Sequence, residues 1–222
     1  MQIQNITFQS IDNQFLISTI YKSAAANGLE LTTRPSYKGV QSFSYGDVII
    51  GPDGSKMQPQ LFLRNINDGG HALMIGVGVY RHVCMNGLVV GDDFFSRRII
   101  HRKGQTLDNF LMYLEKDLTD AFRIAADYHM EKLTELFNTN ISDHTAMQII
   151  GSLSLPIGVI DKAIYSWAKP REEDKGSNLF SLYNIVNEAN RRRSSSTQAF
   201  DKELGLLQHI EALYAHEMFK AA

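Results

Sequence analysis

The spacing of apolar residues changes once along the chain, near Gly104, and this change constrains the fold more than any other feature. Before it, from about Asp47 to Lys103, short alternating runs are separated by Gly, Pro, Asn and Asp, a pattern typical of strands joined by turns. After it, apolar residues recur every three and four positions, which is typical of amphipathic helices. We therefore predict an α+β fold, with a sheet first and helices after it.

The strands are expected to form an antiparallel meander, and the longest run, HALMIGVGVYRHV, predicts two different faces. One face is apolar and is predicted to lie on the core: Leu73, Ile75, Val77, Val79 and Val83. The other face is mixed: Ala72, Met74, Gly76, Gly78, Tyr80, His82 and Cys84. The two glycines indicate a curved strand, or a place where another backbone or a ligand comes close.

A long helix, capped by Thr106 and running from about 107 to 137, is predicted to pack on the curved meander of about 47–103. These elements would make an α+β core domain of residues 1–140, and a C-terminal helical region, 141–222, would pack on it. The region is expected to hold four helices: one capped by Ser142, one after Pro156, one at about 179–189 and one at about 198–220.

Composition excludes several classes of function. The formal net charge is -2, so no overall basic field attracts nucleic acid or an anionic membrane, and such binding would need a local patch. The single cysteine cannot form an internal disulfide, and the histidines lack metal-ligand spacing. No apolar stretch is long enough to span a membrane, and we expect a cytoplasmic protein. Nucleotide-binding and hydrolase motifs are absent from the sequence, so no cofactor is expected.

The segment YRHVCMNGLVVG, residues 80–91, holds that cysteine, Cys84. His82 would lie about 7 Å from it along the same strand face, too far for a hydrogen bond, so we interpret Cys84 as a buried thiol rather than a nucleophile. A base from elsewhere in the fold remains an alternative. Asn86 and Gly87 are predicted to form the two-residue turn of a β-hairpin, because this pair adopts positive φ at least cost.

A basic run, FFSRRIIHRKG, closes the predicted sheet. Cations that follow phosphates beside aromatic rings that stack bases are the usual equipment for binding single-stranded nucleic acid. The alternative is that these charges protect an edge strand from aggregation. In the binding interpretation, the cations contact phosphates and two rings stack on bases; these residues are Arg97, Arg98, Arg102, Lys103, Tyr80 and Phe95.

The run from Arg81 to Val89, RHVCMNGLV, resembles the R-x-V-C-x-N-G-L core of a family of uncharacterised phage- and plasmid-like proteins. Arg81, Cys84, Asn86 and Gly87 carry this resemblance, and LFSLYNIVNEANRR, residues 179–192, is similar to the family's C-terminal helix. The family is known as a domain of unknown function on mobile elements. Its members often lie near replication and recombination genes, which implies a role in DNA metabolism.

These observations lead to three hypotheses. The first is a non-enzymatic phage or plasmid protein that binds single-stranded DNA in replication or recombination, with a homo-oligomer as a possible form. The second is a protein–protein interaction module that inhibits or redirects a host protein, for example in a defence system, through an exposed apolar patch. The third is an enzyme that uses Cys84 with a histidine.

Overall fold

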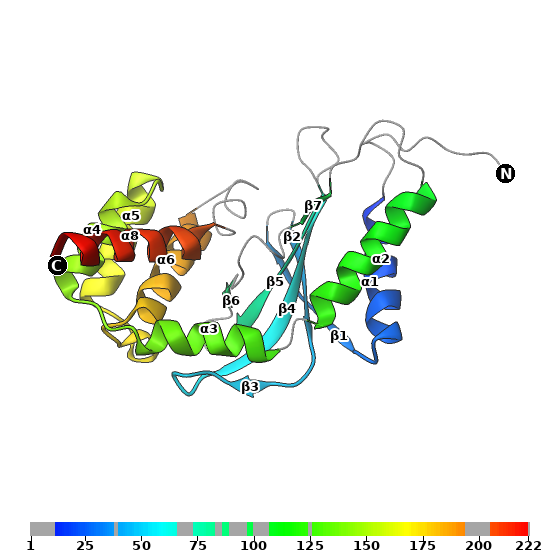
Figure 1. The fold of residues 1–222 in the computed structure, drawn as a ribbon, viewed down its shortest axis with the longest axis horizontal. Helices are drawn as coiled ribbons and strands as arrows, with labels where there is room; N and C mark the ends of the chain where they lie inside the picture. The colour runs from blue at the N-terminus through cyan, green and yellow to red at the C-terminus, as the bar shows by residue number, and fades with distance from the viewer. Residues whose placement is uncertain are drawn as a thin grey trace.

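The computed structural model of the 222-residue chain describes residues 12–37, 40–65, 73–82, 86–88, 97–99, 107–123, 126–193 and 205–221. An antiparallel sheet stands in the centre, with two helices on one side and a group of helices on the other (Figure 1). This arrangement confirms the predicted α+β fold with a helical C-terminal region.

The sheet begins earlier in the chain than the meander predicted from about 47. Neighbouring strands follow the order β1-β2-β4-β5-β6, while β3 pairs with β4 and β7 pairs with β5. The first two strands, LTTRPSY and VQSFSY, are rich in hydroxyl residues, so their apolar alternation is weak. The strands are β1 (Leu31–Tyr37), β2 (Val40–Tyr45), β3 (Ile49–Ile50), β4 (Lys56–Arg64), β5 (Leu73–Arg81), β6 (Asn86–Leu88) and β7 (Arg97–Ile99).

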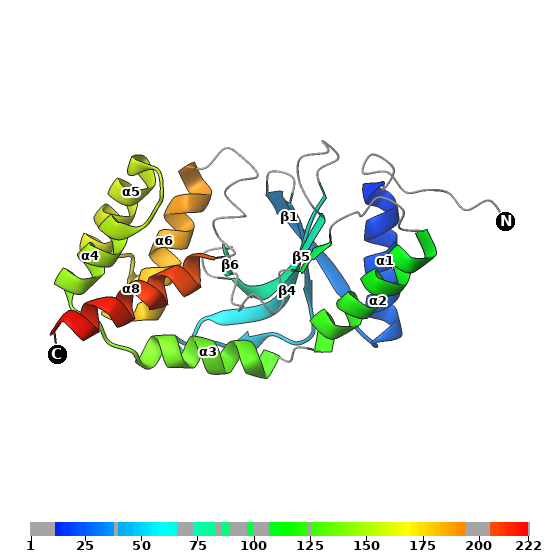
Figure 2. The ribbon, with the colours of Figure 1, turned by 45° about the horizontal axis from the view of Figure 1, so that its top comes forward.

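One face of the sheet packs on α1 (Asn13–Ala26) and α2 (Leu107–Arg123), as Figures 1 and 2 show. The predicted apolar face of β5 supplies part of this core, because Leu73, Ile75 and Val77 belong to the same cluster as the buried residues of both helices. The other face of β5 is buried as well, so the strand is covered on both sides.

The single helix predicted for about 107–137 is wrong, because two helices occupy this region. After α2 ends at Arg123, α3 spans Ala126–Asn138 and packs with a different set of residues. Its buried Leu133 and Leu136 belong to a second core cluster, formed with the C-terminal helices and with Met57 of the sheet. The apolar spacing continues through both helices, so the sequence alone did not show that they face different cores.

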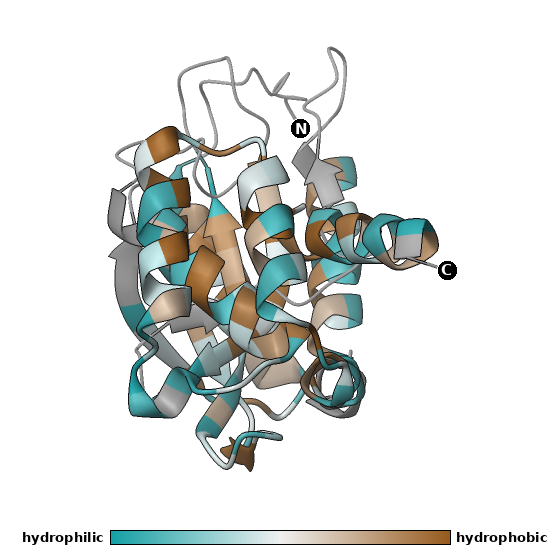
Figure 3. Cartoon of the chain, turned by 90° about the vertical axis from the view of Figure 1, so that its left-hand side faces the viewer, coloured by the Kyte–Doolittle hydropathy of each residue, from teal (hydrophilic) through white to brown (hydrophobic). Residues whose placement is uncertain are grey.

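The C-terminal helices are α4 (Asp143–Ser152), α5 (Ile157–Ala168), the short 3-10 helix η1 (Glu172–Asp174), α6 (Leu179–Arg193) and α8 (Leu206–Ala221). Ser142 caps α4 as predicted, because its side chain accepts a hydrogen bond of 3.1 Å from the backbone of Thr145. The start predicted for the last helix, near 198, and the Thr106 cap lie outside the described residues. Hydrophilic and hydrophobic residues alternate along these helices, as expected where one face points inward (Figure 3).

Candidate functional site

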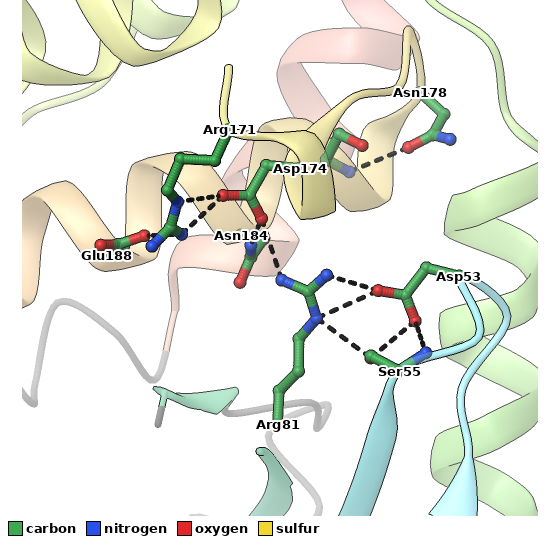
Figure 4. A network of polar contacts seen from close by, with 9 residues as sticks. Asp53, Ser55, Arg81, Arg171, Asp174, Asn178, Asn184 and Glu188 are labelled. Atoms are coloured by element: carbon green, nitrogen blue, oxygen red, sulfur yellow. Dashed lines mark hydrogen bonds and ion pairs between the residues drawn. The ribbon is translucent and has the colours of Figure 1, made fainter. Parts of the chain in front are cut away.

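The most extensive buried polar arrangement among the described residues is centred on Arg81, the last residue of β5, whose exposed fraction is 0%. Its Nε lies 3.0 Å from Oδ2 of Asp53 and 3.1 Å from Oγ of Ser55. Nη2 also donates to Asp53, and Nη1 donates to Oδ1 of Asp174 at 2.9 Å. One guanidinium therefore joins a turn of the sheet to the helical region (Figure 4).

Asp174 lies at the end of η1 and is shared between several donors. Arg171 donates from Nε to Oδ2 of Asp174 at 2.8 Å, and its Nη2 also pairs with Glu188 of α6. Nδ2 of Asn184, also on α6, donates to Oδ1 of Asp174 at 2.5 Å. The network thus runs from the sheet through η1 to α6 (Figure 4).

Local structure positions both carboxylates of this network. Asp53 lies in the turn before β4, where its Oδ1 accepts from the backbone and hydroxyl of Ser55, and Gly54 adopts a φ of 77° that favours glycine. On the helical side, Asn178 accepts from the backbone of Ser181 at the start of α6. Because each carboxylate already faces a guanidinium, this arrangement is suited to holding the two parts together rather than to exchanging protons.

A second polar arrangement lies on the mixed face of the sheet. Arg34 of β1 reaches across β2 and donates from Nε to Oγ of Ser44 at 2.8 Å and from Nη2 to Oε1 of Gln58 on β4 at 2.8 Å. Its guanidinium carbon stands 4.6 Å from the centre of the Tyr80 ring on β5. One arginine therefore spans four neighbouring strands.

Two more basic residues lie close to Arg34. The ring of His82 meets Tyr80 edge-on, with centroids 5.0 Å apart, and its backbone N–H donates to the carbonyl of Lys56. The pKa of His82 is lowered below its ordinary value by burial first, and then by the positive charges of Arg34 and Lys56. Positively charged side chains therefore lie close together at this end of the sheet.

The opposite end of the same face is also basic. The strand register places Arg64 of β4 opposite Met74 of β5, and Met74 opposite Arg98 of β7. Nη2 of Arg64 lies 2.5 Å from the sulfur of Met74. Gly76 and Gly78 lie between the two ends of β5. On the mixed face, the cations therefore flank a part of the strand that carries no side chain. Met74 and Tyr80 are six residues apart, or about 20 Å along a strand.

The structure describes only part of the set of residues predicted to bind nucleic acid. Tyr80 is 8% exposed, and Arg34 occupies one face of its ring. Arg98 lies in the register of the mixed face, whereas Arg97 lies opposite Ile75 of the core face. The remaining residues of this set lie outside the described part of the chain, and so does the motif residue Cys84; they are Phe95, Arg102 and Lys103.

The hairpin formed by β5 and β6 corrects the turn predicted at Asn86–Gly87. Asn86 pairs with Arg81 and Gly87 pairs with Tyr80, so both residues lie on the returning strand rather than in the turn. The reason is that β5 stays paired with β4 as far as Arg81, which lies opposite Met57. This pairing brings the guanidinium of Arg81 to the carboxylates of Asp53 and Asp174. From the sequence, Arg81 was identified only as one of the residues that carry the family resemblance.

The described residues contain neither a cluster of metal-ligating side chains nor a membrane-spanning helix. No group of three or more His, Cys, Asp or Glu side chains in them could hold a metal ion. None of the helices described has both the length and the apolar character needed to cross a membrane.

Comparison with known proteins adds one finding. The model of a family described as a domain of unknown function (DUF932) matches residues 44–210, which include most of the sheet, the ionic network and most of the C-terminal helices. Neither the curated proteins nor the solved structures contain a significant match to the chain.

Proposed function

The chain belongs to the DUF932 family, and we propose that it is a non-enzymatic phage or plasmid protein that binds single-stranded nucleic acid in replication or recombination. The observation that supports this proposal best is the arrangement of the mixed face of the sheet, where Arg34 and Arg64 stand at opposite ends of a strip of β5 that contains Gly76 and Gly78.

This arrangement suits a polyanion. Phosphates need cations at intervals along a strand, and bases need flat surfaces with little steric obstruction. The mixed face offers cations about 20 Å apart. Because this face of β5 is buried, a ligand would reach the glycines between the cations only by displacing what covers them. Gln58 and Ser44 accept hydrogen bonds from Arg34 and so hold its guanidinium in place.

Exposure indicates where contact with the ligand would begin. Lys56 is exposed, and Arg34, Gln58 and His82 are partly exposed, whereas Arg64 is only 2% exposed. We therefore place the first phosphate contacts at Arg34 and Lys56, and contacts near Arg64 would follow only as the ligand displaces what covers that end.

The test is fluorescence anisotropy of a labelled single-stranded oligonucleotide at low and at physiological salt. We expect binding that weakens steeply with salt, and the double substitution Arg34→Gln and Lys56→Gln should lower the salt slope by about two. Lys116→Gln and Lys22→Gln together are the matched control, because both lysines are exposed and lie on the helices that cover the other face.

The basic strand needs its own variant, with Arg97, Arg98, Arg102 and Lys103 all changed to Gln. We expect it to bind the oligonucleotide more weakly than the natural protein. Absence of binding by the natural protein at low salt would overturn the proposal and favour a protein partner. Loss of binding on Cys84→Ser would contradict its non-enzymatic, thiol-independent character.

A further inference from the structure

A small pocket lies in the helical region of the molecule. It has a volume of about 150 Å³ and opens between α5 and α6. Lys162, Tyr165 and Lys169 line one wall, while Arg171 and Glu188 of the ionic network line another. The pocket therefore begins at the surface and ends at the buried network seen in Figure 4.

Two lysines line this pocket and lie beside the same aromatic ring. The ammonium groups of Lys162 and Lys169 lie 5.4 Å and 5.5 Å from the centre of the Tyr165 ring. Within the described residues, neither lysine forms an ion pair with a carboxylate. The two carboxylates of the pocket, Asp174 and Glu188, are both paired with Arg171 and so do not neutralise the lysines.

We propose that this pocket binds a phosphate monoester group that contacts Lys162 and Lys169. Such a group carries close to two negative charges at neutral pH, which would offset the charge of both lysines. The hydroxyl of Ser166 also lines the pocket and can donate to a phosphate oxygen. Because drug-sized ligands need roughly 300 Å³ or more, the volume fits a single small anionic group rather than a whole nucleotide.

The ionic network connects this pocket to the sheet. Arg171 lines the pocket and also holds Asp174, which in turn holds Arg81 of the sheet. A phosphate beside Arg171 would compete with the two carboxylates for its donors. The simpler interpretation is that both lysines only lay their alkyl chains along Tyr165 and keep their charges in water, and the experiment separates the two.

The experiment is isothermal titration calorimetry of the full chain with inorganic phosphate, using chloride at equal ionic strength as background. We expect saturable binding near about 1 mM. The double substitution Lys162→Gln and Lys169→Gln should weaken it by tenfold or more, as loss of charged hydrogen bonds predicts. The control, Lys175→Gln, removes an exposed lysine that already pairs with Glu172, and phosphate binding should stay unchanged.

Two sources of the phosphate can be distinguished with the same variants. A 5′-phosphorylated oligonucleotide that binds more tightly than its 5′-hydroxyl form, only when both lysines are present, identifies a strand end. Equal binding of the two forms, together with binding of inorganic phosphate, identifies a free phosphate or a small phosphomonoester. No saturable phosphate binding, or equal losses in the double variant and in Lys175→Gln, would overturn the inference. The Arg34→Gln, Lys56→Gln variant should keep phosphate binding, which makes this result independent of the proposed function.

Discussion

Arg81 and Asp174 are 93 positions apart in the chain, yet their side chains form a buried ion pair with 2.9 Å between Nη1 and Oδ1. Both residues are almost completely shielded from solvent. Through this pair, the end of a central strand is fixed to the helical region, and Asp53 pairs with the same guanidinium from the other side.

Replacement of Arg81 should therefore be severe. We expect Arg81→Met to lower the free energy of unfolding by about 3–5 kcal/mol, because Asp53 and Asp174 would be left buried without their common partner. Urea denaturation measures this change. Lys220→Gln is the control, since it removes an exposed pair with Glu217 and should cost at most about 0.5 kcal/mol.

A double-mutant cycle tests whether the loss of stability comes from the interaction between Arg81 and Asp174. Asp174→Asn combined with Arg81→Met should destabilise the protein by less than the sum of the two single changes, because the second change removes a carboxylate that the first left unpaired. Strict additivity would show that the two side chains do not interact energetically.

Protonation of His82 should weaken the fold. Its pKa is lowered in the folded state by burial and by Arg34 and Lys56, so the unfolded chain binds the proton more tightly. Stability is then fully present above the ordinary histidine pKa of about 6.5 and is lost as pH falls below it. NMR titration of the His82 ring reports the pKa directly, and urea denaturation across this pH range reports the stability.

The same titration tests the electrostatic cause. Lys56→Gln should raise the pKa of His82 towards its ordinary value, whereas Lys116→Gln should leave it unchanged. A bound single-stranded oligonucleotide should also raise it, because phosphates would offset the nearby positive charges. An unchanged His82 pKa in the saturated complex would contradict phosphate contacts at this end of the sheet.

Gly176 precedes α6 in a tightly packed place. A Cβ atom there would lie 2.6 Å from Oγ of Ser181 and 3.1 Å from Nδ2 of Asn178, the residue that accepts at the start of the helix. We expect Gly176→Ala to destabilise the protein by about 1–3 kcal/mol in urea denaturation. Gly151→Ala in α4 is the matched control, because no atom lies within 4 Å of its added Cβ. That change should stabilise by up to about 1 kcal/mol, and equal effects of both would contradict the steric argument.

Ser142 provides a test of a feature predicted from sequence. We expect Ser142→Ala to cost about 0.5–2 kcal/mol, because the backbone N–H of Thr145 loses its acceptor. Thermal or urea denaturation measures the change. Ser152→Ala, at the exposed far end of α4, should change stability by less than about 0.5 kcal/mol. A similar loss in both variants would show that the cap is not the cause.

Local patterns explain which parts of the fold the sequence predicted. Alternation identified the core face of β5, and Ser142 and Pro156 marked helix starts, because these signals act over a few neighbouring residues. The hairpin between β5 and β6 was predicted, but the turn was placed at Asn86–Gly87 because the propensity of this pair was given more weight than the pairing of β5 with β4.

The ionic network could not be predicted in the same way. Arg81 and Asp174 come together only through the fold, and a single sequence gives no measure of such distant pairing. A partial signal was present, because an arginine directly after the apolar run of β5 would be buried and would need a carboxylate. In the sequence, Asp174 stands in a run of charges, EED, and nothing local separates it from its neighbours.

Helix α6 is buried along nearly all of residues 179–190, and asparagines recur there at Asn184, Asn187 and Asn190, all at most 1% exposed. Apolar contacts alone are not directional, so a helix surrounded by them could rotate or slide by a residue at little cost. Amides must instead meet particular donors and acceptors. Asn184 meets such a partner, because its Nδ2 donates to Asp174, and this contact sets the angle of the helix about its own axis and with it the direction in which Glu188 faces Arg171.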